Sequence, residues 1–126
     1  MKLKTLMIIN TAVALVFGIA FVLIPWQVFK IYGPGSSEIL NYMGQLLGAA
    51  FIGFGLISWR ARNAEQSDAL KAIVFSFFVA HVIGFIVALI GQLNNIVNVF
   101  GWTTVLIYLF LSIGYGYFYF SKKNGK

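Results

Sequence analysis

Residues 72–92 form an unbroken apolar run, AIVFSFFVAHVIGFIVALIGQ, in which His81 is the only strongly titratable side chain. A helix rises about 1.5 Å per residue, so a run of this length crosses the hydrocarbon core of a bilayer, which is about 30 Å thick. Three more apolar runs lie at about residues 3–24, 38–59 and 102–120. The sequence therefore predicts an all-α, polytopic membrane protein in which residues 1–126 form one four-helix transmembrane domain.

The composition supports this class. Only 10% of the residues are charged and 60% are hydrophobic, whereas about a quarter of a soluble domain is charged. The absence of cysteine excludes disulfides, thiolate chemistry and thiol metal sites. A net charge of +6 would suit nucleic acid, but all the basic residues lie between or beside the apolar runs. We therefore expect membrane lipids as partners and no nucleic acid.

The distribution of basic residues predicts the orientation of the bundle. The positive-inside rule places loops rich in Lys and Arg in the cytoplasm. Lys30 is the only basic residue between the first and second spans or between the third and fourth. We expect an up-down-up-down bundle in the cell (inner) membrane with both termini cytoplasmic. The basic residues on the predicted cytoplasmic side are Lys2, Lys4, Arg60, Arg62, Lys71, Lys122, Lys123 and Lys126.

The segments between the apolar runs predict further local structure. Residues 25–37 are rich in aromatic and apolar side chains, which predicts an interfacial segment with one short amphipathic turn. Gly33-Pro34-Gly35 is expected to force a turn. Ser36 or Ser37 is predicted to cap the second span, and Ser67 the third.

The second span is rich in glycine. Gly44 and Gly48 are four residues apart, and Gly53 follows Ala49 at the same spacing. Such spacings allow close backbone approach between helices in lipid. We expect Gly44, Gly48, Gly53 and, in the third span, Gly84 to be helix-packing positions, with a ligand groove as the alternative.

Polar side chains within the spans are costly in hydrocarbon unless they are paired. In the first three spans they share helical faces with small residues. One interpretation is a common cavity in which they bind a ligand or relay a proton. The other is a set of interhelical hydrogen bonds of about 0.6 kcal/mol each. The candidates for an intramembrane polar cluster or ligand site are Asn10, Gln45, His81, Gln92 and Ser112.

Known catalytic patterns are missing. The three acidic residues lie in loops or at a span end, so no carboxylate pair is available for acid–base catalysis. A single histidine forms neither a bis-histidine haem site nor a zinc site within one chain. We therefore expect no catalytic residues, no metal and no cofactor, unless an oligomer brings several copies of His81 together.

A family resemblance supports the four-span interpretation. Gly18 and Pro25 near the end of the first span, the stretch GQLLGAAFIGFG that starts at Gly44, and the sequence WRAR that ends at Arg62 resemble small bacterial membrane proteins of the DoxX-like kind. The resemblance implies four spans. The acidic residue expected in the second span of that family is absent here, so it implies no activity for this chain.

Three functions remain open at this point. The first is a non-enzymatic membrane protein whose glycine-lined bundle binds a lipid, another apolar small molecule or a transmembrane helix of a membrane-protein partner. The second is a small homo-oligomeric transporter or channel with His81 as its proton-sensitive group. The third is an intramembrane enzyme or quinone-linked redox subunit that uses His81.

Overall fold

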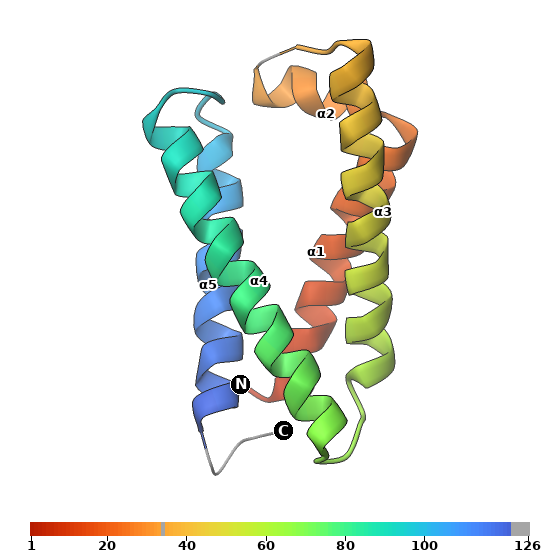
Figure 1. The fold of residues 1–126 in the computed structure, drawn as a ribbon, viewed down its shortest axis with the longest axis vertical. Coiled ribbons are helices and arrows are strands. Elements are labelled where there is room, and N and C mark those ends of the chain that lie inside the picture. Colours follow the sequence, from red (N-terminus) through yellow and green to blue (C-terminus); the bar gives the residue numbers. More distant parts are fainter. Residues whose placement is uncertain (34, 122–126) are drawn as a thin grey trace.

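The computed structural model describes residues 1–33 and 35–121, and the described chain is helical apart from its connections (Figure 1). The four long helices are each long and apolar enough to cross a membrane. The prediction of an all-α chain with four candidate spans is therefore confirmed, with one short helix added. The helices are α1 (Leu3–Leu23), α2 (Pro25–Tyr32), α3 (Glu38–Ala61), α4 (Asp68–Leu93) and α5 (Gly101–Phe120).

Serine side chains set the starts of α3 and α4. The Ser37 hydroxyl accepts a hydrogen bond from the backbone N–H of Leu40 at 3.2 Å, and Ser67 does the same for Leu70 at 3.1 Å. Each cap satisfies a backbone donor that has no partner within the helix. The predicted caps are confirmed, and the cap at Ser67 starts α4 four residues before the predicted boundary at residue 72.

The segment after α1 forms a helix of its own. Pro25 is at the first position of α2, where its missing N–H costs no hydrogen bond and its fixed φ suits the helix. The helix ends at Tyr32, and Gly33, which has a φ of 108°, caps it. Gly35 has a φ of 79°, and Pro34, the centre of the predicted turn, lies outside the described residues. The expected single turn is thus an eight-residue helix.

The four long helices are arranged as two pairs. α1 packs along α3, and α4 packs along α5. Figure 1 shows the two pairs diverging toward the end that carries α2. This divergence creates the space in which the candidate site lies.

Glycines allow the close approach within each pair. A Cβ on Gly48 would lie 2.6 Å from the carbonyl oxygen of Gly18, so α1 and α3 touch backbone to backbone there. Gly44 receives the ring of Phe29, and Gly84 receives the ring of Tyr108 from α5. Gly53 differs, because no heavy atom of the described chain lies within 4 Å of the position of its Cβ.

The two pairs meet at the end where α1 begins. All four long helices contribute buried apolar side chains to one cluster there, which we call the closed-end core. Leu6, Met7 and Tyr115 have no exposed surface within it. The members of the closed-end core are Leu3, Leu6, Met7, Ala61, Leu70, Val74, Phe77, Leu111, Tyr115 and Phe118.

The outer faces of the long helices are also apolar. Val16 on α1 is 66% exposed, Val87 on α4 is 64% exposed and Leu106 on α5 is 60% exposed. An apolar surface of this extent would be a liability in water but is suited to contact with acyl chains. The exposed apolar faces therefore agree with a multi-pass membrane protein.

Candidate binding cavity

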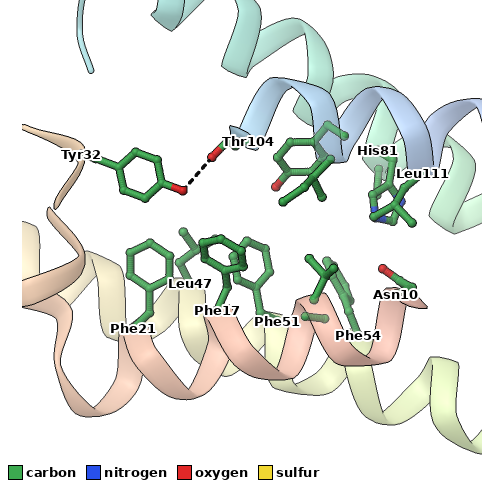
Figure 2. Close-up of a pocket in the computed structure, with 15 residues that line it drawn as sticks. Asn10, Phe17, Phe21, Tyr32, Leu47, Phe51, Phe54, His81, Thr104 and Leu111 are labelled. Atoms are coloured by element: carbon green, nitrogen blue, oxygen red, sulfur yellow. Dashed lines mark hydrogen bonds between the residues drawn. The ribbon is translucent and has the colours of Figure 1, made fainter. Parts of the chain in front are cut away.

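A cavity of about 200 Å³ lies between the α1–α3 pair and the α4–α5 pair (Figure 2). It occupies the space left by the divergence of the pairs, and every helix contributes to its lining. Most of the lining side chains are apolar, and many are aromatic. They are Asn10, Val13, Ala14, Phe17, Phe21, Tyr32, Leu47, Phe51, Phe54, Ala80, His81, Thr104, Ile107, Tyr108 and Leu111.

Phenylalanine rings form the wall on the α1–α3 side. Phe17 and Phe21 come from α1, and Phe51 and Phe54 come from α3. Figure 2 shows these four rings along the same side of the cavity. The rings of Phe21 and Phe51 are 6.2 Å apart and tilted by 56°, a spacing typical of favourable aromatic pairs. We call these four rings the phenylalanine wall, which offers ring faces and edges and no hydrogen-bonding group.

Polar atoms are found on the α4–α5 side. His81 from α4 and Thr104 and Tyr108 from α5 line this wall together with Ile107 and Leu111. The rings of His81 and Tyr108 are 5.8 Å apart. The α1–α3 side is therefore mainly apolar and aromatic, with Asn10 as its one polar lining residue, whereas the α4–α5 side presents His81, Thr104 and Tyr108.

The ring of His81 is held in place by two contacts. Its Nδ1 lies 2.6 Å from the carbonyl oxygen of Phe77 one turn earlier. A carbonyl oxygen only accepts, so Nδ1 carries the proton and donates. The ring also stacks on Tyr115, with centroids 5.6 Å apart and planes 19° apart. In the neutral ring, Nε2 is therefore an acceptor with a fixed position.

Asn10 lies across the cavity from His81 (Figure 2). Its side chain is 2% exposed, and its Nδ2 donates to Ser58 Oγ on α3 at 2.6 Å. The hydroxyl of Tyr115 is near Asn10 and Ser58 but does not reach hydrogen-bonding geometry with any described residue. These groups form a polar patch where the cavity meets the closed-end core.

Hydrogen bonds close the opposite end, where α2 contacts the α4–α5 pair. Thr104 Oγ1 donates to the hydroxyl of Tyr32 at 3.1 Å, as Figure 2 shows. Asn98, in the connection between α4 and α5, donates from Nδ2 to the carbonyl of Ile31 at 2.9 Å. Its backbone N–H donates to the carbonyl of Tyr32 at 2.9 Å. We call these three hydrogen bonds the α2 latch.

The family model described as Domain of unknown function (DUF8292) matches residues 1–121. The chain belongs to this family. No curated protein and no solved structure matches the chain. The matched region contains all five helices, so the cavity, the closed-end core and the α2 latch all lie within it.

The structure brings two of the five predicted polar residues to the cavity, namely His81 and Asn10. The other three are engaged elsewhere. Gln45 Nε2 donates to the carbonyl of Val22 at 3.1 Å, and Ser112 Oγ donates to the carbonyl of Tyr108 at 2.6 Å. Gln92 Nε2 donates to the carbonyl of Asn98 at 3.1 Å, next to the α2 latch. A ligand-binding role for any of the five stays a prediction.

The phenylalanine wall and the latch pair, Tyr32 and Thr104, were not among the predicted site residues. Phenylalanines that line a cavity have the same local pattern as phenylalanines that face lipid, so the sequence carries no signal for them. Thr104 did carry one, because it is a hydroxyl within an apolar run. Among the described residues, no group of three or more histidines, cysteines or carboxylates is placed to hold a metal ion.

Proposed function

We propose that this protein is a non-enzymatic membrane protein that binds an apolar small molecule in the cavity between its two helix pairs. The observation that carries the proposal is an aromatic-lined cavity of about 200 Å³ between the two helix pairs. Apolar cavities in proteins stay dry, and one of about 150 Å³ takes up benzene. The cavity therefore suits a molecule of about one substituted ring or the end of a lipid chain.

The position of the cavity supports access from the bilayer. The cavity is only partly enclosed, and it lies between helices whose outer faces are apolar. A molecule dissolved among acyl chains reaches it without passing through water. Such a molecule gains little from the hydrophobic effect, so dispersion contacts with the phenylalanine wall supply the binding free energy.

The size of the cavity supports a small molecule over the transmembrane helix of a partner. A helix that crosses a bilayer is about 30 Å long. The closed-end core fills the space between the pairs at one end, so a partner helix does not fit along the length of the bundle. The lining also differs from the glycine-lined bundle expected from the sequence, because no glycine is among the lining residues.

Transport with His81 as a proton-sensitive group is the second candidate. The observation in its favour is that His81 lines the cavity. Transport needs a path past His81, and the buried side chains of Leu6, Leu111 and Tyr115 occupy that direction. This packing supports binding over passage. A pH-dependent flux in liposomes that is altered by His81→Ala would instead support transport.

We further propose that the long helices cross the cell (inner) membrane up-down-up-down with both termini cytoplasmic. Lys2 and Arg62 belong to the end with the closed-end core, whereas Lys30 belongs to α2. Figure 1 shows the start of α1 and the α3–α4 connection at one end and α2 at the other. The positive-inside rule then supports a cytoplasmic closed-end core. Lys122, Lys123 and Lys126, which contribute to the same rule, lie outside the described residues.

Native mass spectrometry from a mild detergent tests the binding proposal. The wild-type protein is expected to retain a bound small molecule or lipid. Val13 lines the cavity, so Val13→Phe fills part of it and is expected to abolish the retained mass. Val16 on the same helix is 66% exposed, so Val16→Phe adds the same bulk outside the cavity and is the matched control. Equal retention by the two variants, or none by the wild type, would contradict the proposal.

A further inference from the structure

We infer that the molecule bound in this cavity is a small phenol, whose aromatic ring lies against the phenylalanine wall and whose hydroxyl donates to His81 or Asn10. The inference rests on the proposed binding function and names the chemical class of the ligand. It is carried by the polar atoms that the chain leaves unpaired at the cavity.

His81 offers an acceptor and no donor to the cavity. Its Nδ1 proton is already donated to the carbonyl oxygen of Phe77, which leaves Nε2 as the free nitrogen of the neutral ring. No described residue forms a hydrogen bond with Nε2. Leaving this acceptor without a hydrogen bond in an apolar cavity costs free energy. A ligand that brings an O–H or N–H donor is therefore favoured over one that does not.

Asn10 adds a second acceptor opposite the first. Its Nδ2 donates to Ser58, and the nearby hydroxyl of Tyr115 does not reach hydrogen-bonding geometry with it. Figure 2 shows the oxygen of Asn10 turned toward the cavity, across from His81. A hydroxyl placed between the two residues has an acceptor on either side. An ether or a ketone has no proton to give to either of them.

The aromatic walls of the cavity favour a ligand whose hydroxyl is attached to a flat ring. Four phenylalanine rings line one side, and the ring of Tyr108 lines the other. Aromatic rings pair favourably in tilted and edge-to-face arrangements, so a flat ring fits between these walls better than a flexible chain. A volume of about 200 Å³ admits one ring with small substituents and excludes a fused ring system with a long tail.

The cavity lining carries no charged side chain, which favours a neutral ligand. None of the lining residues is Asp, Glu, Lys or Arg. An ionised ligand would lose its hydration without gaining an ion pair. A phenol is neutral at physiological pH, since its pKa is about 10, and it brings one donor with an apolar ring.

The test compares four probes of similar size in the protein reconstituted in nanodiscs, with empty nanodiscs as the blank. The probes are 4-methylphenol, p-xylene, 4-methylanisole and 4-methylcyclohexanol. The first two have nearly the same shape and differ in the hydroxyl, the third blocks the proton and the fourth lacks the aromatic ring. Titration calorimetry is expected to show the phenol binding about five- to tenfold more tightly than p-xylene and 4-methylanisole, as one net hydrogen bond predicts.

Variants of His81 and Asn10 test which residue accepts the hydrogen bond from the phenol. His81→Phe keeps an aromatic ring and removes Nε2, and Asn10→Leu removes the opposite acceptor. Each is expected to reduce the preference for the phenol over p-xylene, with folding checked by the unfolding midpoint. Ser112→Ala is the matched control, because Ser112 is a span residue that bonds to its own helix and does not line the cavity. It is expected to keep the preference.

The outcomes separate this inference from the binding proposal. Equal affinity for p-xylene and 4-methylphenol, as a water molecule between Asn10 and His81 would give, overturns the hydroxyl assignment and leaves the binding proposal standing. Equal affinity for 4-methylcyclohexanol overturns the aromatic part. A preference that survives in both His81→Phe and Asn10→Leu overturns the acceptor assignment. Failure of all four probes to bind overturns the binding proposal as well.

Discussion

Thr104 on α5 donates a hydrogen bond of 3.1 Å to the hydroxyl of Tyr32 on α2 across the wider end of the cavity. Both residues line the cavity, so the bond is part of its boundary. The two helix pairs meet mainly at the closed-end core, which is at the other end. The α2 latch therefore joins α2 to the α4–α5 pair at the end where the two helix pairs diverge.

The Tyr32–Thr104 hydrogen bond is expected to contribute measurably to stability. Tyr32→Phe and Thr104→Val each remove one partner and keep most of the side-chain volume. A double-mutant cycle should give a coupling energy of about 0.5–1.5 kcal/mol, measured as the free energy of unfolding in mixed detergent–SDS micelles. Tyr42 is 56% exposed, so Tyr42→Phe should leave that free energy unchanged. Strictly additive effects at Tyr32 and Thr104 would show that the bond is not formed in the membrane.

The α1–α3 contact should not tolerate a methyl group at Gly48. The new Cβ would lie 2.6 Å from the carbonyl oxygen of Gly18, so the two backbones would have to separate. Gly48→Ala is expected to destabilise the protein by about 1–3 kcal/mol, as overpacking does. Gly53→Ala is the matched control on the same helix. It meets no described atom within 4 Å and should be neutral or stabilising by up to about 1 kcal/mol.

The buried bond between Asn10 and Ser58 should show coupling of the size typical within membranes. Asn10→Ala and Ser58→Ala each remove one side of the 2.6 Å contact. The coupling energy is expected to be about 0.6 kcal/mol and no more than about 1.7 kcal/mol. The same unfolding assay measures it. A value near zero would mean that Asn10 finds another partner once Ser58 is removed.

The proposed orientation predicts which connections a reagent reaches from outside the cell. The chain has no cysteine, so Ser36→Cys and Asn63→Cys each introduce a single thiol at an exposed position. A membrane-impermeant maleimide applied to intact cells, with the outer membrane permeabilised where one is present, should label the variant at position 36. It should label the variant at position 63 only after the membrane is disrupted. The reverse pattern would overturn the assignment of cytoplasmic termini.

The long helices could be predicted because their signals lie within short stretches of the sequence. Each span is an apolar run whose length and flanking charges are read directly from the sequence, and a serine next to such a run satisfies the first free backbone donors wherever the helix packs. Ser37 and Ser67 were identified as caps for this reason. Asn10 and His81 were identified as candidates because a polar group within an apolar run needs a partner whatever the tertiary structure is.

The remaining features depend on which helix lies beside which. Gln45 and Ser112 have the same local signal as His81, but Gln45 bonds to a carbonyl of α1 and Ser112 to one of its own helix. A polar side chain in a span bonds to a carbonyl within its reach, and that carbonyl belongs to its own helix or to a neighbour. The phenylalanine wall is a further example. Whether Phe51 faces a cavity or lipid follows from the divergence of two helix pairs, which no local pattern records.

The pairing of the helices also bears on biogenesis. α1 and α3 are in contact through Gly18 and Gly48, and neither α4 nor α5 takes part in that crossing. The N-terminal hairpin is therefore free to assemble in the bilayer once residue 61 has left the ribosome, while the C-terminal hairpin is still being made. The closed-end core takes side chains from all four long helices, so it is complete only when both hairpins are present.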